Sequence, residues 1–176
     1  FQFTSYTMLV IPLFVFMGEI AFHSGISKRI YRTAHAWLGF IPGGLAVATI
    51  GACAGFAAIC GSSTATAATM GTVALEEMKR YKYGARLATG CIAAGGSLSS
   101  LIPPSMPFII YGVFTDTSIG KMFNGGIFPG ILLSILYLAL IFILCKRNPN
   151  LGPPGPSYSW QELLASLSGV IGVLIL

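Results

Sequence analysis

Charged side chains are scarce in this chain, and acidic ones most of all. Only 9% of the 176 residues are charged and only five are Asp or Glu, while 55% are hydrophobic. Soluble globular proteins carry charge on about a quarter of their residues, so this composition excludes that class and predicts a membrane protein. The ten Lys and Arg fall in short clusters between apolar runs. We therefore expect a lipid bilayer around the chain and no nucleic acid partner.

Groups for metal binding or catalysis are also few. The four cysteines show no CxxC spacing and the chain has two histidines, so we expect buried thiols and no organic cofactor. A Gly-Ser pair at membrane depth would suit an intramembrane serine hydrolase, a remote alternative that needs a base near the nucleophile. The candidate bases are His23 and His35, and both flank a basic cluster and not the Gly-Ser pair. We do not expect an enzyme.

Apolar run lengths and basic clusters divide the chain into segments. A membrane-spanning helix needs about 20 apolar residues, and basic residues gather on the cytoplasmic side of a membrane. We divide the chain by these two rules. The apolar run that ends at Leu176 predicts a longer polypeptide. The predicted order is a transmembrane helix at 1–25, an amphipathic interfacial helix at 26–40, a re-entrant hairpin at 41–75, a cytoplasmic loop at 76–86, a broken transmembrane helix at 87–115, a transmembrane helix at 116–145, a linker at 146–159 and the truncated start of a second repeat at 160–176.

The hairpin prediction rests on the run from Ile41 to Leu75. This run is too long for one span, too short for two spans with a loop, and basic at both ends. A hairpin that enters and leaves on the cytoplasmic side satisfies length and charge together. The alternative is one long, kinked span whose Ser and Thr hydroxyls bond to their own helix.

Two polar, irregular stretches interrupt the apolar runs. Gly61 to Thr66 lies at the predicted hairpin tip, and three prolines between Ile102 and Pro107 must break the following helix. Backbone freed at membrane depth needs protein, water or an ion as a partner. The available ligands are uncharged oxygens, which favour a monovalent cation, with sodium as the first expectation. The hydroxyls concerned are those of Ser62, Ser63, Thr64, Ser99, Ser100 and Ser105.

A family resemblance joins these stretches. The segments FAAICGSSTATAATMG, RLATG, AAGG and IPPS occur in this order between Phe56 and Ser105. Together they resemble the large membrane subunit of tripartite ATP-independent periplasmic (TRAP) transporters, DctM-like proteins of the ion-transporter superfamily. The resemblance covers roughly Leu9 to Pro149 and implies an all-α integral membrane fold. It further implies half of an inverted-repeat elevator transporter, with this chain as the first repeat.

The resemblance implies a sodium-coupled importer of a carboxylate-bearing molecule, such as a C4-dicarboxylate or sialic acid. Its partners would be a small membrane subunit and a periplasmic binding protein, in the inner membrane of a bacterium or archaeon. A standalone sodium/dicarboxylate symporter of the same superfamily is the alternative. Implied sodium ligands are Gly61, Ser62, Ser63, Gly95, Gly96, Pro103, Pro104 and Ser105. Implied substrate ligands are Ser62, Ser63, Thr64 and Ser105.

Overall fold

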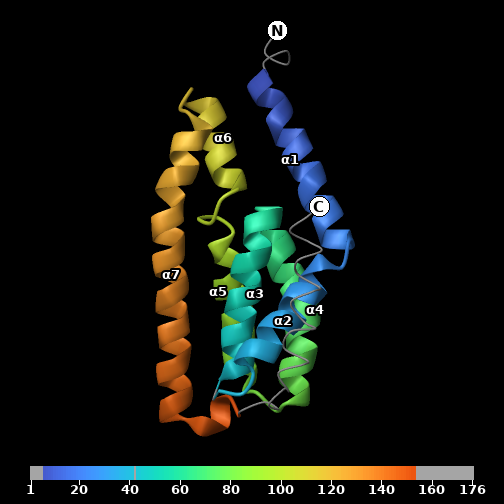
Figure 1. Ribbon diagram of the computed structural model, residues 1–176, viewed down its shortest axis with the longest axis vertical. Helices are drawn as coiled ribbons and strands as arrows, with labels where there is room; N and C mark the ends of the chain where they lie inside the picture. Colours follow the sequence, from blue (N-terminus) through green and yellow to red (C-terminus); the bar gives the residue numbers. More distant parts are fainter. Residues whose placement is uncertain (1–5, 42, 154–176) are drawn as a thin grey trace.

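The computed structural model describes residues 6–41 and 43–153, and these residues form helices and turns without a strand (Figure 1). The all-α prediction is confirmed. The elements are α1 (Tyr6–His23), α2 (Ile26–Leu38), α3 (Gly44–Cys60), α4 (Ser63–Arg80), α5 (Ala85–Leu98), α6 (Met106–Phe114), α7 (Ile119–Arg147) and the 3-10 turn η1 (Pro149–Leu151).

Helices α3 and α4 form an antiparallel hairpin. Gly61 ends α3 with a left-handed backbone at φ 61°, and its amide donates to the Ala57 carbonyl. The extended Ser62 then begins α4 by accepting a hydrogen bond from the Ala65 amide. The two arms pack side by side with the tip part-way along α7 (Figure 1). The run from Ile41 to Leu75 thus forms two arms packed on each other and not one continuous helix.

A second break separates α5 from α6. Helix α5 ends at Leu98 and α6 begins at Met106, so residues 99–105 leave the helix around Pro103 and Pro104. Proline lacks an amide donor and clashes with the carbonyl one turn back, which explains why the helix ends here. Figure 1 shows this break at the level of the hairpin tip.

Several element bounds differ from the sequence prediction. The predicted loop at 76–86 is mostly helix, because α4 continues five residues beyond Leu75 to Arg80 and α5 begins at Ala85. Residues 76–80 are good helix formers, and Met78 among them is fully buried. The segment 160–176 lies outside the described residues. Assignment of the segments to membrane, interface or cytoplasm stays a prediction.

The hairpin is the centre of the molecule. Small residues along α3 are inaccessible, including Ala46, Ala48, Ala52 and Ala57 at 0% exposure. Helices α2, α4 and α5 pack around this arm. Small side chains allow such close helix approach, which is the usual way that membrane helices pack.

Helix α7, in contrast to the hairpin, is mostly exposed. Among the described residues it is the one helix long and apolar enough to cross a membrane, and only 11% of its apolar window is buried. At 1.5 Å per residue it is about 43 Å long. The apolar segments Ile11–Ala21 and Gly44–Cys60 are shorter.

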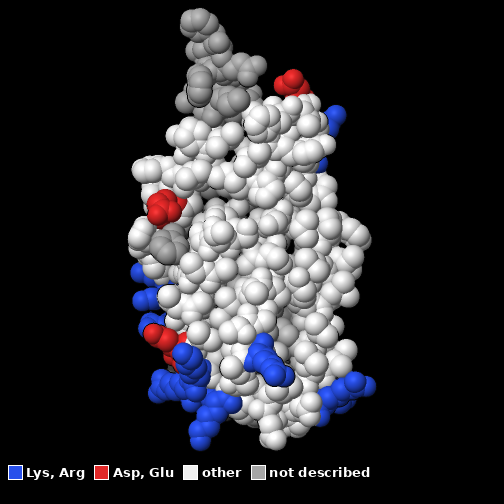
Figure 2. Space-filling model, turned by 180° about the vertical axis from the view of Figure 1, so that it is seen from behind, with Lys and Arg blue, Asp and Glu red and all other residues white. Residues whose placement is uncertain are grey.

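Basic residues gather at one end of the molecule. Figure 2 shows most Lys and Arg side chains at the end where α4 and α7 finish. Lys79 and Arg80 close α4, and Lys146 and Arg147 close α7. The carboxyl ends of α4 and α7 therefore carry their basic residues at the same end of the molecule.

The same end is held together by backbone hydrogen bonds, which we call the basal clasp. The Gly43 amide donates to the Gly152 carbonyl at 2.9 Å, and the Gly84 amide donates to the Leu151 carbonyl at 3.1 Å. The Leu45 amide donates to the Tyr83 hydroxyl at 3.2 Å. Burial raises the pKa of Tyr83 to about 12. The starts of α3 and α5 are thus tied to the residues that follow α7.

Candidate functional site: the hairpin tip and the helix break

The hairpin tip and the helix break touch each other. The Gly61 carbonyl accepts a hydrogen bond of 3.2 Å from the amide of Met106, the first residue of α6. A Cβ added at Gly61 would collide with the Pro104 carbonyl oxygen and with the ring of Phe14. Only glycine combines the left-handed backbone with so close an approach. The two irregular stretches singled out from the sequence therefore meet in the structure.

Hydroxyl groups surround the tip. The Ser62 and Thr64 hydroxyls lie 3.2 Å apart, and the Thr66 hydroxyl donates to the Ser62 carbonyl at 2.8 Å. Thr64 is exposed, whereas Ser62 and Ser63 are half-buried. The tip therefore presents neutral oxygens on a surface that a small ligand can reach.

A buried hydrogen bond lies behind the tip. The hydroxyls of Thr66 and Ser99 are 2.8 Å apart, and both residues have 0% exposure. Because Thr66 donates to the Ser62 carbonyl, Ser99 must donate to Thr66. This bond joins α4 to the break. Thr66 was absent from the predicted site residues, although its spacing of four from Ser62 places both on one face of the helix.

The predicted residues of the break take different positions. Ser105 is fully buried, and its hydroxyl donates to the Ser100 carbonyl at 2.7 Å, which holds the loop closed. Pro103 and Pro104 are half-buried, and the Pro104 carbonyl faces the tip. The Ser105 hydroxyl is therefore engaged within its own loop.

The two predicted glycines of α5 face different neighbours. A Cβ built on Gly96 would lie 3.3 Å from the Ser63 carbonyl oxygen, so Gly96 borders the tip. A Cβ built on Gly95 would instead lie 2.5 Å from the Cys53 sulfur of α3. The structure thus brings Gly96 beside the predicted site and places Gly95 in the packing between α3 and α5.

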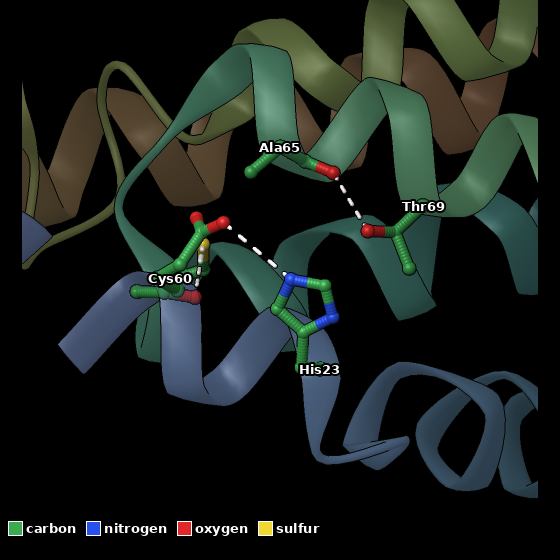
Figure 3. Close-up of polar contacts among 6 residues, drawn as sticks. His23, Cys60, Ala65 and Thr69 are labelled. Atoms are coloured by element: carbon green, nitrogen blue, oxygen red, sulfur yellow. Dashed lines mark hydrogen bonds and ion pairs between the residues drawn. The ribbon is translucent and has the colours of Figure 1, made fainter. Parts of the chain in front are cut away.

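Helix α1 covers the end of α3 beside the tip. Figure 3 shows Cys60 facing α1, where its thiol donates to the Gly18 carbonyl at 3.6 Å. On α4, the Thr69 hydroxyl donates to the Ala65 carbonyl at 2.8 Å (Figure 3). These bonds satisfy polar groups within the protein. The four cysteines are buried and free, as the sequence predicted.

Titratable groups lie away from the tip. The His23 ring lies 3.5 Å from the Glu19 carboxylate, and both side chains are well exposed, so this pair contributes little to stability. His35 is packed between the rings of Tyr31 and Tyr81, and burial lowers its pKa. In the part of the chain that the structure describes, no three His, Cys, Asp or Glu residues cluster as metal ligands. The ligands available at the tip are neutral oxygens.

Comparison with known proteins places this arrangement in a family. The family model described as "Tripartite ATP-independent periplasmic transporter, DctM component" matches residues 2–176. The chain belongs to this family. The resemblance read from the tip and break motifs is thereby confirmed.

Characterised relatives carry different substrate names. The chain is 38% identical over 97% of its length to the C4-dicarboxylate TRAP transporter large permease protein DctM of Pseudomonas aeruginosa, and covers 40% of that protein. It is 35% identical over 87% of its length to the sialic acid large permease SiaM of Vibrio cholerae, covering 36%. The isethionate permease DctMQ of Oleidesulfovibrio alaskensis is 40% identical over 82% of the chain, which covers 23% of it.

The chain thus spans two fifths or less of the length of these relatives. Their names describe transporter permeases and indicate no catalytic function. Family membership supports a membrane location for this DctM chain.

Proposed function

We propose that this DctM chain is part of the large membrane subunit of a sodium-coupled secondary transporter. The complete transporter would import a carboxylate-bearing small molecule by an elevator movement, with this chain as the first of two inverted repeats. The contact between the Met106 amide and the Gly61 carbonyl carries the proposal, because it joins the hairpin tip to the helix break. Broken helices that meet in this way form ion and substrate sites in transporters.

The oxygen ligands favour sodium as the coupling ion. The Ser62, Ser63 and Thr64 hydroxyls and the carbonyls of Gly61 and Pro104 are neutral. Hard cations bind oxygen, and a ligand set without carboxylates suits a single positive charge better than two. Gly96 of α5 borders this group of oxygen ligands. Gly95 instead packs α5 against α3.

The amino terminus of α4 is the better anion site of the two helix starts. The Met106 amide of α6 already donates to Gly61, and the next residue, Pro107, has no amide hydrogen. At α4, the Ser63 and Thr64 amides begin a helix of 18 residues, and Thr64 is exposed. Helix amino termini attract carboxylates. We place the substrate carboxylate at Ser62, Ser63 and Thr64, with Ser105 supporting the loop beside them.

Delivery by a periplasmic binding protein is preferred to standalone symport. The three relatives described above are all named as TRAP transporter permeases. We therefore propose a small membrane subunit and a binding protein as partners, in the inner membrane of the cell. Uptake by the membrane subunits alone would favour the standalone symporter.

Substitution at the tip and at the break tests the proposal. In the full-length protein in vesicles, Ser63→Ala and Pro104→Ala should each raise the sodium concentration for half-maximal uptake by about tenfold, the effect of losing roughly 1.4 kcal/mol of binding. Ser134→Ala is the matched control, because its hydroxyl bonds to the Gly130 carbonyl of its own helix, α7. Labelled C4-dicarboxylate and sialic acid are the first substrates to supply with the binding protein. Unchanged uptake and unchanged sodium dependence in both variants would refute the site.

A further inference from the structure

A long groove lies between α5 and α7, with α3 as its floor. Its volume is about 470 Å³. The lining is apolar except for one charged side chain, Arg86, and the hydroxyl of Tyr137. Representative lining residues are Ile50, Arg86, Gly90, Ala94, Tyr137 and Leu140.

The groove has a charged end at Arg86, and the Tyr137 hydroxyl at its other end lies 3.3 Å from the Ser97 hydroxyl. On α5 it runs from Arg86 to Ala94, a rise of about 12 Å at 1.5 Å per residue. On α7 it runs in the opposite chain direction, from Tyr137 to Leu144. Arg86 lies in the first turn of α5, and Leu144 lies just before Lys146 and Arg147 in the last turns of α7, at the basic end of the molecule. The charge therefore lies at the end where a membrane surface is predicted, and the apolar part points toward the middle of the bilayer.

Gly90 borders open space on the groove side of α5. A Cβ built on this exposed glycine meets no atom within 4 Å. Gly95 lies five residues further along α5 on a different face, and a Cβ built there would lie 2.5 Å from the Cys53 sulfur. The groove face of α5 is thus open, whereas the face toward α3 is closely packed.

A second cavity of about 290 Å³, between α2 and α4, has a different character. Lys28 and Arg32 line one side and Glu76 and Glu77 line the other. A site with both signs of charge does not select an anion. Among the lining residues of the α5–α7 groove there is no acidic group to oppose Arg86.

We propose that the α5–α7 groove binds an anionic phospholipid of the cytoplasmic leaflet, with an acyl chain along Gly90 and Ala94 and the phosphate at Arg86. The guanidinium group binds phosphate oxygens in a two-pronged geometry that lysine cannot match. Basic side chains at the cytoplasmic ends of helices attract anionic headgroups. The assignment uses the membrane location and the predicted cytoplasmic position of the basic end, and does not rest on the sodium or substrate site.

The experiment counts lipids bound to the full-length permease. The protein is purified from bilayers of mixed phosphatidylglycerol and phosphatidylcholine, and the retained lipids are counted by native mass spectrometry. Gly90→Leu should reduce retained phosphatidylglycerol by about fivefold, because the added side chain fills the groove. Gly125→Leu is the matched control, since Gly125 is also open but lies on α7 outside the groove.

A charge variant tests the headgroup separately. Arg86→Gln adds no bulk and should abolish the preference for phosphatidylglycerol over phosphatidylcholine, while Arg80→Gln at the end of α4 should keep it. If Gly90→Leu fails to fold, Arg86→Gln decides. Wild-type retention in Gly90→Leu, or an unchanged preference in Arg86→Gln, overturns the proposal.

A labelling measurement identifies any competing occupant. With a small maleimide, Gly90→Cys in the delipidated full-length protein should react about as fast as Gly125→Cys. Protection of Gly90→Cys alone would mean that another protein segment covers the groove, and this outcome also overturns the proposal.

Discussion

The hairpin tip and α7 differ in how far their groups interact with the rest of the chain. At the tip, the Gly61 carbonyl and the Thr66 hydroxyl bond to groups on other elements, and Thr66 is inaccessible. Along α7, large apolar side chains such as Leu136 and Phe142 are about half exposed. The tip is specified by internal hydrogen bonds, whereas α7 is specified by length and hydropathy. A substitution should therefore have a large effect at the tip and a small one on the outer face of α7.

The largest effect is expected at Gly61. Gly61→Ala forces a Cβ into the Pro104 carbonyl and onto a left-handed backbone, a strain of about 1–3 kcal/mol before the collision is counted. Sodium-dependent uptake should be lost and the thermal midpoint of the purified full-length protein should fall. Gly71→Ala is the control, because a Cβ there meets nothing within 4 Å. Equal behaviour of the two variants would remove the case for a closely fitted tip.

The buried hydroxyl pair should show the next effect. Thr66→Val leaves the Ser99 donor without its acceptor, at a cost of about 1–3 kcal/mol. Thermal unfolding in detergent measures the loss. Adding Ser99→Ala should recover part of it, because both polar partners are then gone. Thr89 is exposed and its hydroxyl bonds to the Ala85 and Arg86 carbonyls of its own helix, so Thr89→Val should change little.

A smaller, pH-dependent effect is expected at His35 on α2. Burial lowers the pKa of His35 below its ordinary 6.5, and the weaker opposing influence of Glu77 raises it. The neutral ring is therefore favoured in the folded state. The contribution of neutral His35 to the free energy of unfolding is complete above the ordinary pKa, and it is lost as the pH falls through the lowered pKa.

The thermal unfolding midpoint, measured at several pH values between about 7.5 and 5.5, tests this expected loss of stability. The midpoint should fall on acidification, and His35→Gln should flatten the dependence. The same slope in both proteins would show that other groups control it.

The smallest effect is expected on the outer face of α7. Leu136→Ala, at a position 55% exposed, should change stability by less than about 0.5 kcal/mol, because lipid tails are as apolar as leucine. Leu98→Ala, fully buried at the end of α5, should cost about 2–5 kcal/mol. Thermal midpoints of the two variants measure the difference. A large loss in Leu136→Ala would indicate that protein rather than lipid covers this face.

The positions of the two breaks could be predicted because they follow from local chemistry. Glycine permits the left-handed residue at Gly61, and Pro103 and Pro104 cannot continue a helix. The end of α4 was predicted too early, since the charges from Glu76 onward resemble a loop although Met78 in the same turn is buried. Charge alone does not reveal which face of a helix is packed.

The partners of the site residues could not be read from the sequence. Whether Gly95 or Gly96 faces the tip depends on the rotation of α5 about its axis, and both are glycine. The contact of Phe14 with Gly61 depends on how α1 crosses α3. Such contacts are set by the packing of whole helices, to which distant segments contribute.

The basal clasp has a mechanical consequence. The Gly43 and Gly84 amides are hydrogen-bonded to residues that follow α7, so the hairpin, α5 and α7 are linked to one another at this end. We expect these helices to be displaced together as a stiff block, with bending concentrated at the α1–α2 joint, where Gly25 is left-handed and has open space around it. Hydrogen exchange should then be slow at the Gly43 and Gly84 amides and faster at Ile26. The reverse order would mean that the block comes apart at its base.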